Sequence, residues 1–164
     1  MPSRQKRPIS AQDLYRIRMV SDTRISPTGQ HVIYTLQRVD QKTEKIYSNL
    51  WIAPTKGGHP YQFTYGDQND ALPRWSPDGS QIAFLSNRGD KEKPPQIYLI
   101  PFTGGEARLL VNIQGTIGAL AWSPDGKTIL YDTVDNPLNP PFLTQPLGIA
   151  SLLLQTALLM GLLL

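Results

Sequence analysis

The chain has 164 residues, a formal net charge of +3 and no cysteine, which excludes a disulfide framework and thiolate metal sites. Its 15 prolines and 13 glycines predict short elements joined by turns, within a length that ordinarily makes one domain. The charge is uneven, because residues 1–24 hold six basic and two acidic side chains and therefore carry +4. No aromatic platform accompanies these basic residues, so we expect a solvated leader and no nucleic-acid partner.

The N-terminal region lacks the apolar run of a secretory signal, which predicts a cytoplasmic protein. Residues 1–9 are expected to form a disordered leader. A short helix should follow, because Ser10 and Asp13 occupy capping-box positions. This helix is predicted to run to about Met19, with Leu14 and Ile17 turned inward.

A five-residue motif, Trp-Ser-Pro-Asp-Gly, occurs twice, and a weaker copy, Ile-Ser-Pro-Thr-Gly, precedes both at residues 25–29. Proline suits the second position of a turn, the serine before it is extended, and glycine can adopt positive φ. Short β-branched or aromatic runs follow each copy, so the motif predicts a strand–turn–strand connection. The favoured interpretation is that these turns build the fold; the alternative is that they line a binding mouth. The two full copies comprise Trp75, Ser76, Pro77, Asp78, Gly79, Trp122, Ser123, Pro124, Asp125 and Gly126.

The flanking residues repeat at the same spacing, since Leu50 and Ile97, like Trp75 and Trp122, are 47 residues apart. A period in the forties with turns at fixed phase is typical of a propeller. We therefore predict an all-β fold, a partial β-propeller of about two and a half four-stranded blades over residues 10–135. Its strands are expected at 24–26, 31–39, 46–53, 61–64, 72–75, 81–86, 96–101, 106–111, 117–122 and 127–134.

The composition changes at Asn136, because the last 29 residues carry no charge. Residues 138–146 are proline-rich, and Leu147–Leu164 is an apolar run that meets the length of a transmembrane helix. Two interpretations of residues 136–164 remain open. The favoured one is an artefact of a lost reading frame, and the other is a helical membrane anchor.

With these repeats, residues 10–135 resemble the N-terminal propeller of the prolyl oligopeptidase family of serine peptidases, in its acylaminoacyl-peptidase and dipeptidyl-aminopeptidase branch. The resemblance lies in residues 13–15 with 20–22, 25–29, 73–79 with 82–88, and 96–101 with 104–106. It implies a seven-bladed propeller that gates the access of peptides to a Ser–Asp–His triad in an α/β-hydrolase domain. This sequence contains no G-x-S-x-G elbow, so no catalytic residue is assigned and the chain is expected to be an inactive, truncated portion.

Other candidate sites have simpler interpretations, and no cofactor or metal is expected. The only histidines, His31 and His59, lie at a strand start and a turn, where surface or packing roles are favoured. Residues 67–70 hold oxygen ligands without the calcium-loop pattern, which favours a solvated loop. The tripeptide Arg88-Gly89-Asp90 is interpreted as turn residues rather than an adhesion signal.

Further expectations concern partners and self-association. A peptide substrate is implied for the intact family member, and a Tol-type propeller that acts by protein contacts is the alternative function. Membrane contact is expected only through Leu147–Leu164. Open terminal blades expose apolar faces and strand edges, so self-association or aggregation is also predicted.

Overall fold

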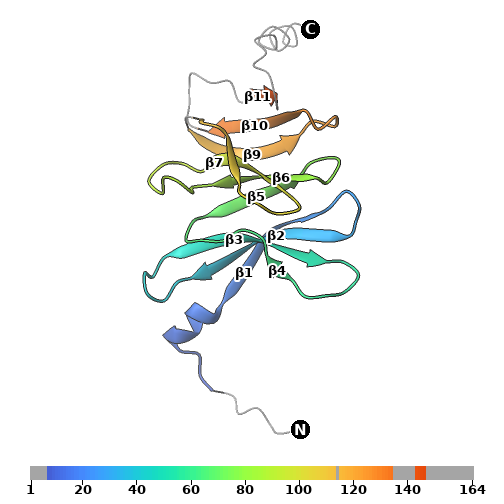
Figure 1. Ribbon diagram of the computed structural model, residues 1–164. Helices are drawn as coiled ribbons and strands as arrows, with labels where there is room; N and C mark the ends of the chain where they lie inside the picture. The colour runs from blue at the N-terminus through green and yellow to red at the C-terminus, as the bar shows by residue number, and fades with distance from the viewer. Residues whose placement is uncertain (1–6, 114, 135–142, 147–164) are drawn as a thin grey trace, which may run out of the picture.

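The computed structural model describes residues 7–113, 115–134 and 143–146. Within these residues, a short 3₁₀ helix, η1 (Ala11–Arg16), precedes eleven strands. Figure 1 shows that the strands form three twisted sheets, stacked one after another in chain order. The strands are β1 (Arg18–Ile25), β2 (His31–Val39), β3 (Ile46–Pro54), β4 (Tyr61–Gln62), β5 (Asp70–Trp75), β6 (Gln81–Ser86), β7 (Gln96–Pro101), β8 (Arg108–Val111), β9 (Thr116–Trp122), β10 (Thr128–Val134) and β11 (Leu143–Pro146).

Each sheet is an antiparallel meander, which we call a blade. Blade 1 has the order β1-β2-β3-β4, blade 2 has β5-β6-β7-β8, and blade 3 contains β9-β10-β11. The first strands of the blades lie together, because β1 contacts β5 and β5 contacts β9. The predicted all-β fold, a partial propeller of two four-stranded blades and part of a third, is confirmed.

The innermost strands of blades 1 and 2 share a distortion that confirms the repeat. The register of β1 against β2 shifts between Ser21 and Arg24, and that of β5 against β6 shifts between Ala71 and Arg74. Two residues before each arginine, Asp22 and Leu72 have positive φ values of 45° and 50°. A β-bulge of this kind bends a strand and increases its twist.

Two apolar clusters hold the blades together, one at each blade-to-blade contact. Between blades 1 and 2 the buried side chains are Ile33, Leu50, Ile52, Ile82, Phe84 and Ile100. Between blades 2 and 3 they are Ala83, Leu85, Ile97, Leu99, Ile113, Ile117, Leu120, Ile129 and Tyr131. Because side chains alternate along β6, consecutive residues of this strand enter opposite clusters. Blade 2 is therefore buried on both faces, as the sequence period predicts.

The N-terminal helix is shorter than predicted. It ends at Arg16, and residues from Arg18 onward join β1, where Arg18 pairs with Arg38 of β2. The sheet ladder thus takes residues that local sequence signals assign to the helix. The prediction that Leu14 and Ile17 turn inward is also wrong, since each is 54% exposed. The capping interaction does form, with the Ser10 amide donating to Asp13 Oδ2 at 2.9 Å.

The structure also corrects the limits of several strands. Strand β4 contains only Tyr61 and Gln62, because the Thr64 hydroxyl caps the Leu50 amide at 2.9 Å in place of a ladder bond. Residues 143–146, predicted to belong to the proline-rich tail, instead form β11, which pairs with Thr128–Tyr131 of β10.

The predicted apolar tail, Leu147–Leu164, lies outside the described residues. Among the residues that are described, no helix is long and apolar enough to span a membrane.

Candidate binding surface at the stacked turns

The first full Trp-Ser-Pro-Asp-Gly copy, at residues 75–79, connects β5 to β6 through a closed set of hydrogen bonds. The Ser76 hydroxyl donates to Asp78 Oδ1 at 2.6 Å and accepts the Gln81 amide at 2.9 Å. Asp78 also accepts the Ser80 amide on Oδ1 and the Ser80 hydroxyl on Oδ2, at 3.0 and 2.7 Å. Gly79 closes the turn with φ of 73°, a value that suits glycine.

The turn at residues 122–126 repeats this arrangement between β9 and β10. The Ser123 hydroxyl donates to Asp125 Oδ1 at 2.5 Å and accepts the Thr128 amide at 2.9 Å. In the weaker copy, Thr28 stands in place of the aspartate and makes one contact, a 3.2 Å hydroxyl bond with Ser26. The first turn is therefore held by fewer side-chain bonds than the other two.

Consecutive turns stack on one another across the blades. A Cβ placed on Gly79 would meet Pro27 Cδ at 3.5 Å, and one on Gly126 would meet Pro77 Cδ at the same distance. Both glycines have positive φ, so the glycine is required by the backbone and the proline of the preceding blade covers it. The same pair of residue types thus makes the contact at both blade-to-blade boundaries, which we call seams.

The motif tryptophans, Trp75 and Trp122, make a second repeated contact across the seams. The indole N–H of Trp75 donates to the carbonyl of Arg24 in blade 1 at 3.2 Å. The indole N–H of Trp122 donates to the carbonyl of Arg74 in blade 2 at 3.0 Å. Arg24 and Arg74 each stand two residues before the serine of their own turn, so donor and acceptor are equivalent at both seams.

Arg74 links all three innermost strands through its side chain. Its Nη1 lies 2.8 Å from Asp22 Oδ2 on β1, and its Nε donates to the Leu120 carbonyl on β9 at 3.0 Å. Arg24 holds the other oxygen of Asp22 at 2.7 Å. The surface formed by β1, β5 and β9, which we call the inner wall, is consequently held by hydrogen bonds. The two arginines and one aspartate of this group leave one positive charge in excess.

A groove of about 360 Å³ lies between the second and third turns. It brings together seven of the ten motif residues, while Trp75, Gly79 and Ser123 do not line it. The Ser76 hydroxyl and the Ser80 donors lower the pKa of Asp78 to about 2, and the Ser123 hydroxyl and Lys127 amide lower that of Asp125. Both carboxylates are therefore anionic acceptors that the turns themselves use. The motif residues that line the groove are Ser76, Pro77, Asp78, Trp122, Pro124, Asp125 and Gly126.

A buried ion pair in blade 2 is a feature that the sequence analysis missed. Asp70, predicted to lie in a solvated loop, has a fully buried side chain, and both of its oxygens accept from Arg88 Nη2 at 3.0 and 3.1 Å. Arg88 Nε donates to Ser86 Oγ at 3.0 Å. Arg88 belongs to the Arg-Gly-Asp tripeptide, where it acts in the fold rather than as a free loop side chain.

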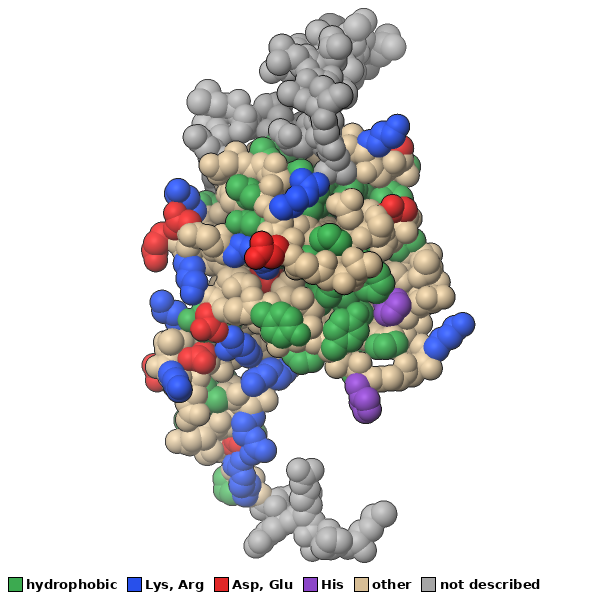
Figure 2. All heavy atoms as spheres, in the orientation of Figure 1, with side chains coloured by type: hydrophobic (Ala, Val, Ile, Leu, Met, Phe, Trp, Pro, Cys, Tyr) green, Lys and Arg blue, Asp and Glu red, His purple; other side chains and the backbone are tan. Residues whose placement is uncertain are grey.

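The two histidines lie where the sequence analysis placed them, on the surface or in packing contacts. His31 is half-buried, with its ring 5.0 Å from Phe102, and His59 is exposed. Trp75 also packs on Phe102, at 5.0 Å. Figure 2 shows the histidine side chains beside a group of hydrophobic side chains, with a basic side chain nearby and many of the charged side chains along the opposite edge. In the described part of the chain, no group of three or more His, Cys, Asp or Glu side chains is placed to hold a metal ion.

Comparison with known proteins places this geometry among propellers of peptidases. Over 126 residues the chain is 40% identical to the uncharacterized peptidase YuxL of Bacillus subtilis, which covers 76% of this chain and 19% of that protein. Over 112 residues it is 35% identical to dipeptidyl-peptidase 5 of Porphyromonas gingivalis, covering 68% of this chain and 16% of that one. The chain therefore spans less than a fifth of the length of these relatives.

A solved structure agrees in fold. Pyrococcus horikoshii acylaminoacyl peptidase superimposes with a TM-score of 0.60 and 23% identity, over 72% of this chain and 18% of that one. A family model described as the TolB beta propeller domain matches residues 12–145, which extend through blades 1 and 2 and into the last strand of blade 3. This match, with the repeated blades and seams described above, shows that the chain belongs to the TolB beta-propeller domain family and is related to the propellers of peptidases.

Proposed function

We propose that this chain is the propeller part of a serine peptidase that cleaves peptides, of the acylaminoacyl- or dipeptidyl-peptidase type. The observation that carries the proposal is the 40% identity to a peptidase, which extends through 126 residues. In the intact protein, hydrolysis would belong to an α/β-hydrolase domain with its nucleophile in a G-x-S-x-G elbow. The propeller would control which substrates reach that domain.

The seams support a gating role because they make a stiff wall. Trp75 and Trp122 bond each blade to the carbonyl of the one before, and Arg74 joins the three innermost strands. A wall with these bonds resists opening between blades, so substrates are selected by their size and flexibility. Unfolded peptides pass such a filter, and folded proteins do not.

The test uses the intact protein, including whatever sequence its gene encodes beyond Asp135. We expect a hydrolase domain with a G-x-S-x-G elbow, and turnover of dipeptidyl or N-acetyl-aminoacyl p-nitroanilides. In the double variant Trp75→Phe and Trp122→Phe, both seam bonds are removed, and cleavage of a long polypeptide such as casein should rise relative to the small substrate. The absence of both an elbow and peptide hydrolysis would refute the proposal.

The second candidate is a Tol-type propeller that acts by binding other proteins. It is favoured by the family model, whose description is the TolB beta propeller domain. Further repeats with no hydrolase domain in the complete gene would support this function over the peptidase. A membrane tether through Leu147–Leu164 is compatible with either, and release of the protein by a carbonate wash would reject it.

A further inference from the structure

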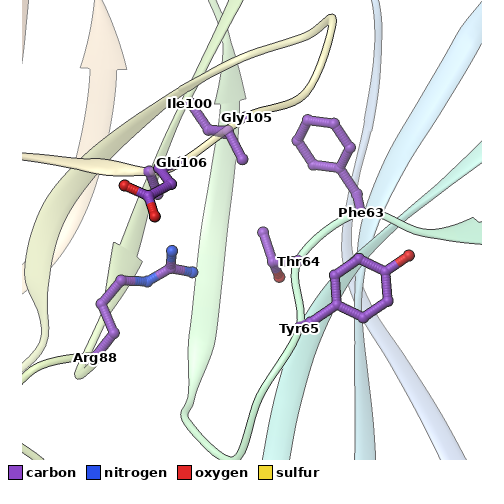
Figure 3. Close-up of a pocket in the computed structure, with 8 residues that line it drawn as sticks. Phe63, Thr64, Tyr65, Arg88, Ile100, Gly105 and Glu106 are labelled. Carbon is purple, nitrogen blue, oxygen red and sulfur yellow. The ribbon is translucent and has the colours of Figure 1, made fainter.

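A cleft of about 430 Å³ separates the outer parts of blades 1 and 2. Figure 3 shows Arg88 and Glu106 of blade 2 on one side, and Thr64, Phe63 and Tyr65 of blade 1 on the other. Phe63, Thr64 and Tyr65 follow the outermost strand of blade 1, and Glu106 precedes the outermost strand of blade 2. The cleft is thus distinct from the inner wall and from the stacked turns.

The Arg88 guanidinium is held in one orientation. Nη2 contacts both oxygens of the buried Asp70, and Nε donates to Ser86 Oγ. Its carbon lies 4.9 Å from the Phe84 ring centroid and 5.2 Å from that of Tyr98. Within the described residues, no side chain or carbonyl accepts from Nη1. Because 23% of the side chain is exposed, this edge is an oriented donor that faces the cleft.

The other groups in the cleft complement this donor. Glu106 is exposed and forms no ion pair in the described part of the chain, so its carboxylate is a free acceptor beside Arg88. Tyr65 is 71% exposed, although its hydroxyl donates to the Gln62 carbonyl at 3.0 Å, which holds the ring out toward solvent. Phe63 is half-buried and tilted against Phe102 at 6.4 Å. Aromatic rings therefore lie on the side of the cleft opposite a donor and an acceptor.

The charges decide which class of ligand fits. The charge of Arg88 is balanced by Asp70, which leaves Glu106 as the unbalanced charge, so an anionic ligand would be repelled. A cationic side chain could pair with Glu106, but it offers no acceptor and would leave the Arg88 Nη1 donor unpaired. An uncharged extended peptide meets neither difficulty: its carbonyl can accept from Arg88 Nη1, its amide can donate to Glu106, and its side chain can lie on Tyr65. Oriented Arg and Tyr side chains are also the types enriched at binding hot spots.

We propose that the cleft between blades 1 and 2 is a binding site for an uncharged, extended peptide segment with an apolar or aromatic side chain. The site goes beyond the proposed gating function, because it lies on the outer part of the blades and requires no catalytic domain. Its donor is positioned before the ligand arrives, which lowers the entropic cost of binding.

The test is an NMR titration of the full ¹⁵N-labelled chain with the capped tetrapeptide N-acetyl-Ala-Phe-Ala-Ala-amide. We expect saturable shifts of the Thr64, Tyr65 and Gly105 amide signals. The same peptide with its backbone nitrogens methylated cannot donate to Glu106, so it should bind about tenfold more weakly, the effect of one hydrogen bond to a charged group.

Exposed side chains allow variants that leave the fold intact. Tyr65→Ala and Glu106→Ala should each weaken the binding of the tetrapeptide about five- to tenfold. The matched controls Tyr61→Ala and Glu92→Ala remove the same side chains from exposed positions outside the cleft, and should bind as the parent chain does. Shifts that appear elsewhere, no saturable shift, or equal losses in the cleft and control variants would overturn the proposal.

Discussion

Replacing Arg88 with methionine tests whether burial, rather than distance, sets the strength of the ion pairs in this fold. Arg88→Met keeps a long side chain over Phe84 and Tyr98 but leaves the Asp70 carboxylate, which is fully buried, without its cation. Within the described residues, the other hydrogen bond to that carboxylate comes from Gln68 Nε2, at 3.4 Å from Oδ2. Breaking a buried pair on one side costs about 3–5 kcal/mol, and we expect a loss of this size in the free energy of unfolding.

The control is Arg38→Met. The ion pair between Arg38 and Asp67 is shorter, at 2.6 Å, but the Asp67 side chain is 60% exposed. An exposed pair contributes about 0–1 kcal/mol, so this variant should lose little stability despite the shorter distance. In the double variant Arg88→Met and Asp70→Leu, no charge remains buried, and most of the loss should be recovered. Urea unfolding followed by tryptophan fluorescence measures all three. Equal losses in Arg88→Met and Arg38→Met would refute the reasoning.

Three further predictions concern the seams, the turns and the open face of blade 1. Trp122→Phe removes the indole bond to the Arg74 carbonyl and should lower the free energy of unfolding by about 1 kcal/mol, measured by urea unfolding; no loss would contradict the seam bond. The Ser76 hydroxyl lowers the pKa of Asp78 to about 2. The stability that the ionised Asp78 side chain contributes is therefore complete above the ordinary aspartate pKa of about 4, and it is lost as the pH falls from there toward 2. The difference in thermal midpoint between Asp78→Asn and the parent chain should therefore shrink over that interval, and a constant difference would argue against it. Val20 and Ile25 are 57% and 63% exposed on β1. We expect concentration-dependent self-association in light scattering, and the double variant Val20→Ser and Ile25→Ser should reduce it. A monodisperse parent chain would contradict this prediction.

Much of the fold could be predicted from the sequence because its turns bound each strand. Strands β2, β6 and β7 lie where the sequence predicts them, since each is a short run with β-branched and aromatic residues between polar or turn-forming segments. The 47-residue spacing also predicts that blades 1 and 2 have equivalent structures, and the shared bulges at Asp22 and Leu72 agree. Local signals suffice for these features.

The seams and the cleft could not be predicted, because they depend on which distant groups meet. A period shows that two segments fold alike, but it does not show that Trp122 donates to a carbonyl 48 residues earlier. Asp70 follows a polar loop and was expected to be solvated; its burial depends on Arg88, which is 18 residues away. The short β4 has a similar cause, since the Thr64 hydroxyl takes the place of a backbone partner. Side-chain competition of this kind is not visible in strand propensities.

The exchange of the indole protons tests the central claim, that each blade is bonded to the one before it by an equivalent tryptophan. The chain has three tryptophans. Trp75 and Trp122 donate across the two seams, while the Trp51 indole makes no hydrogen bond within the described residues. Hydrogen exchange followed by NMR should show the indole protons of Trp75 and Trp122 protected and that of Trp51 exchanging rapidly. Equal exchange rates for all three, or protection of Trp51 alone, would contradict the account.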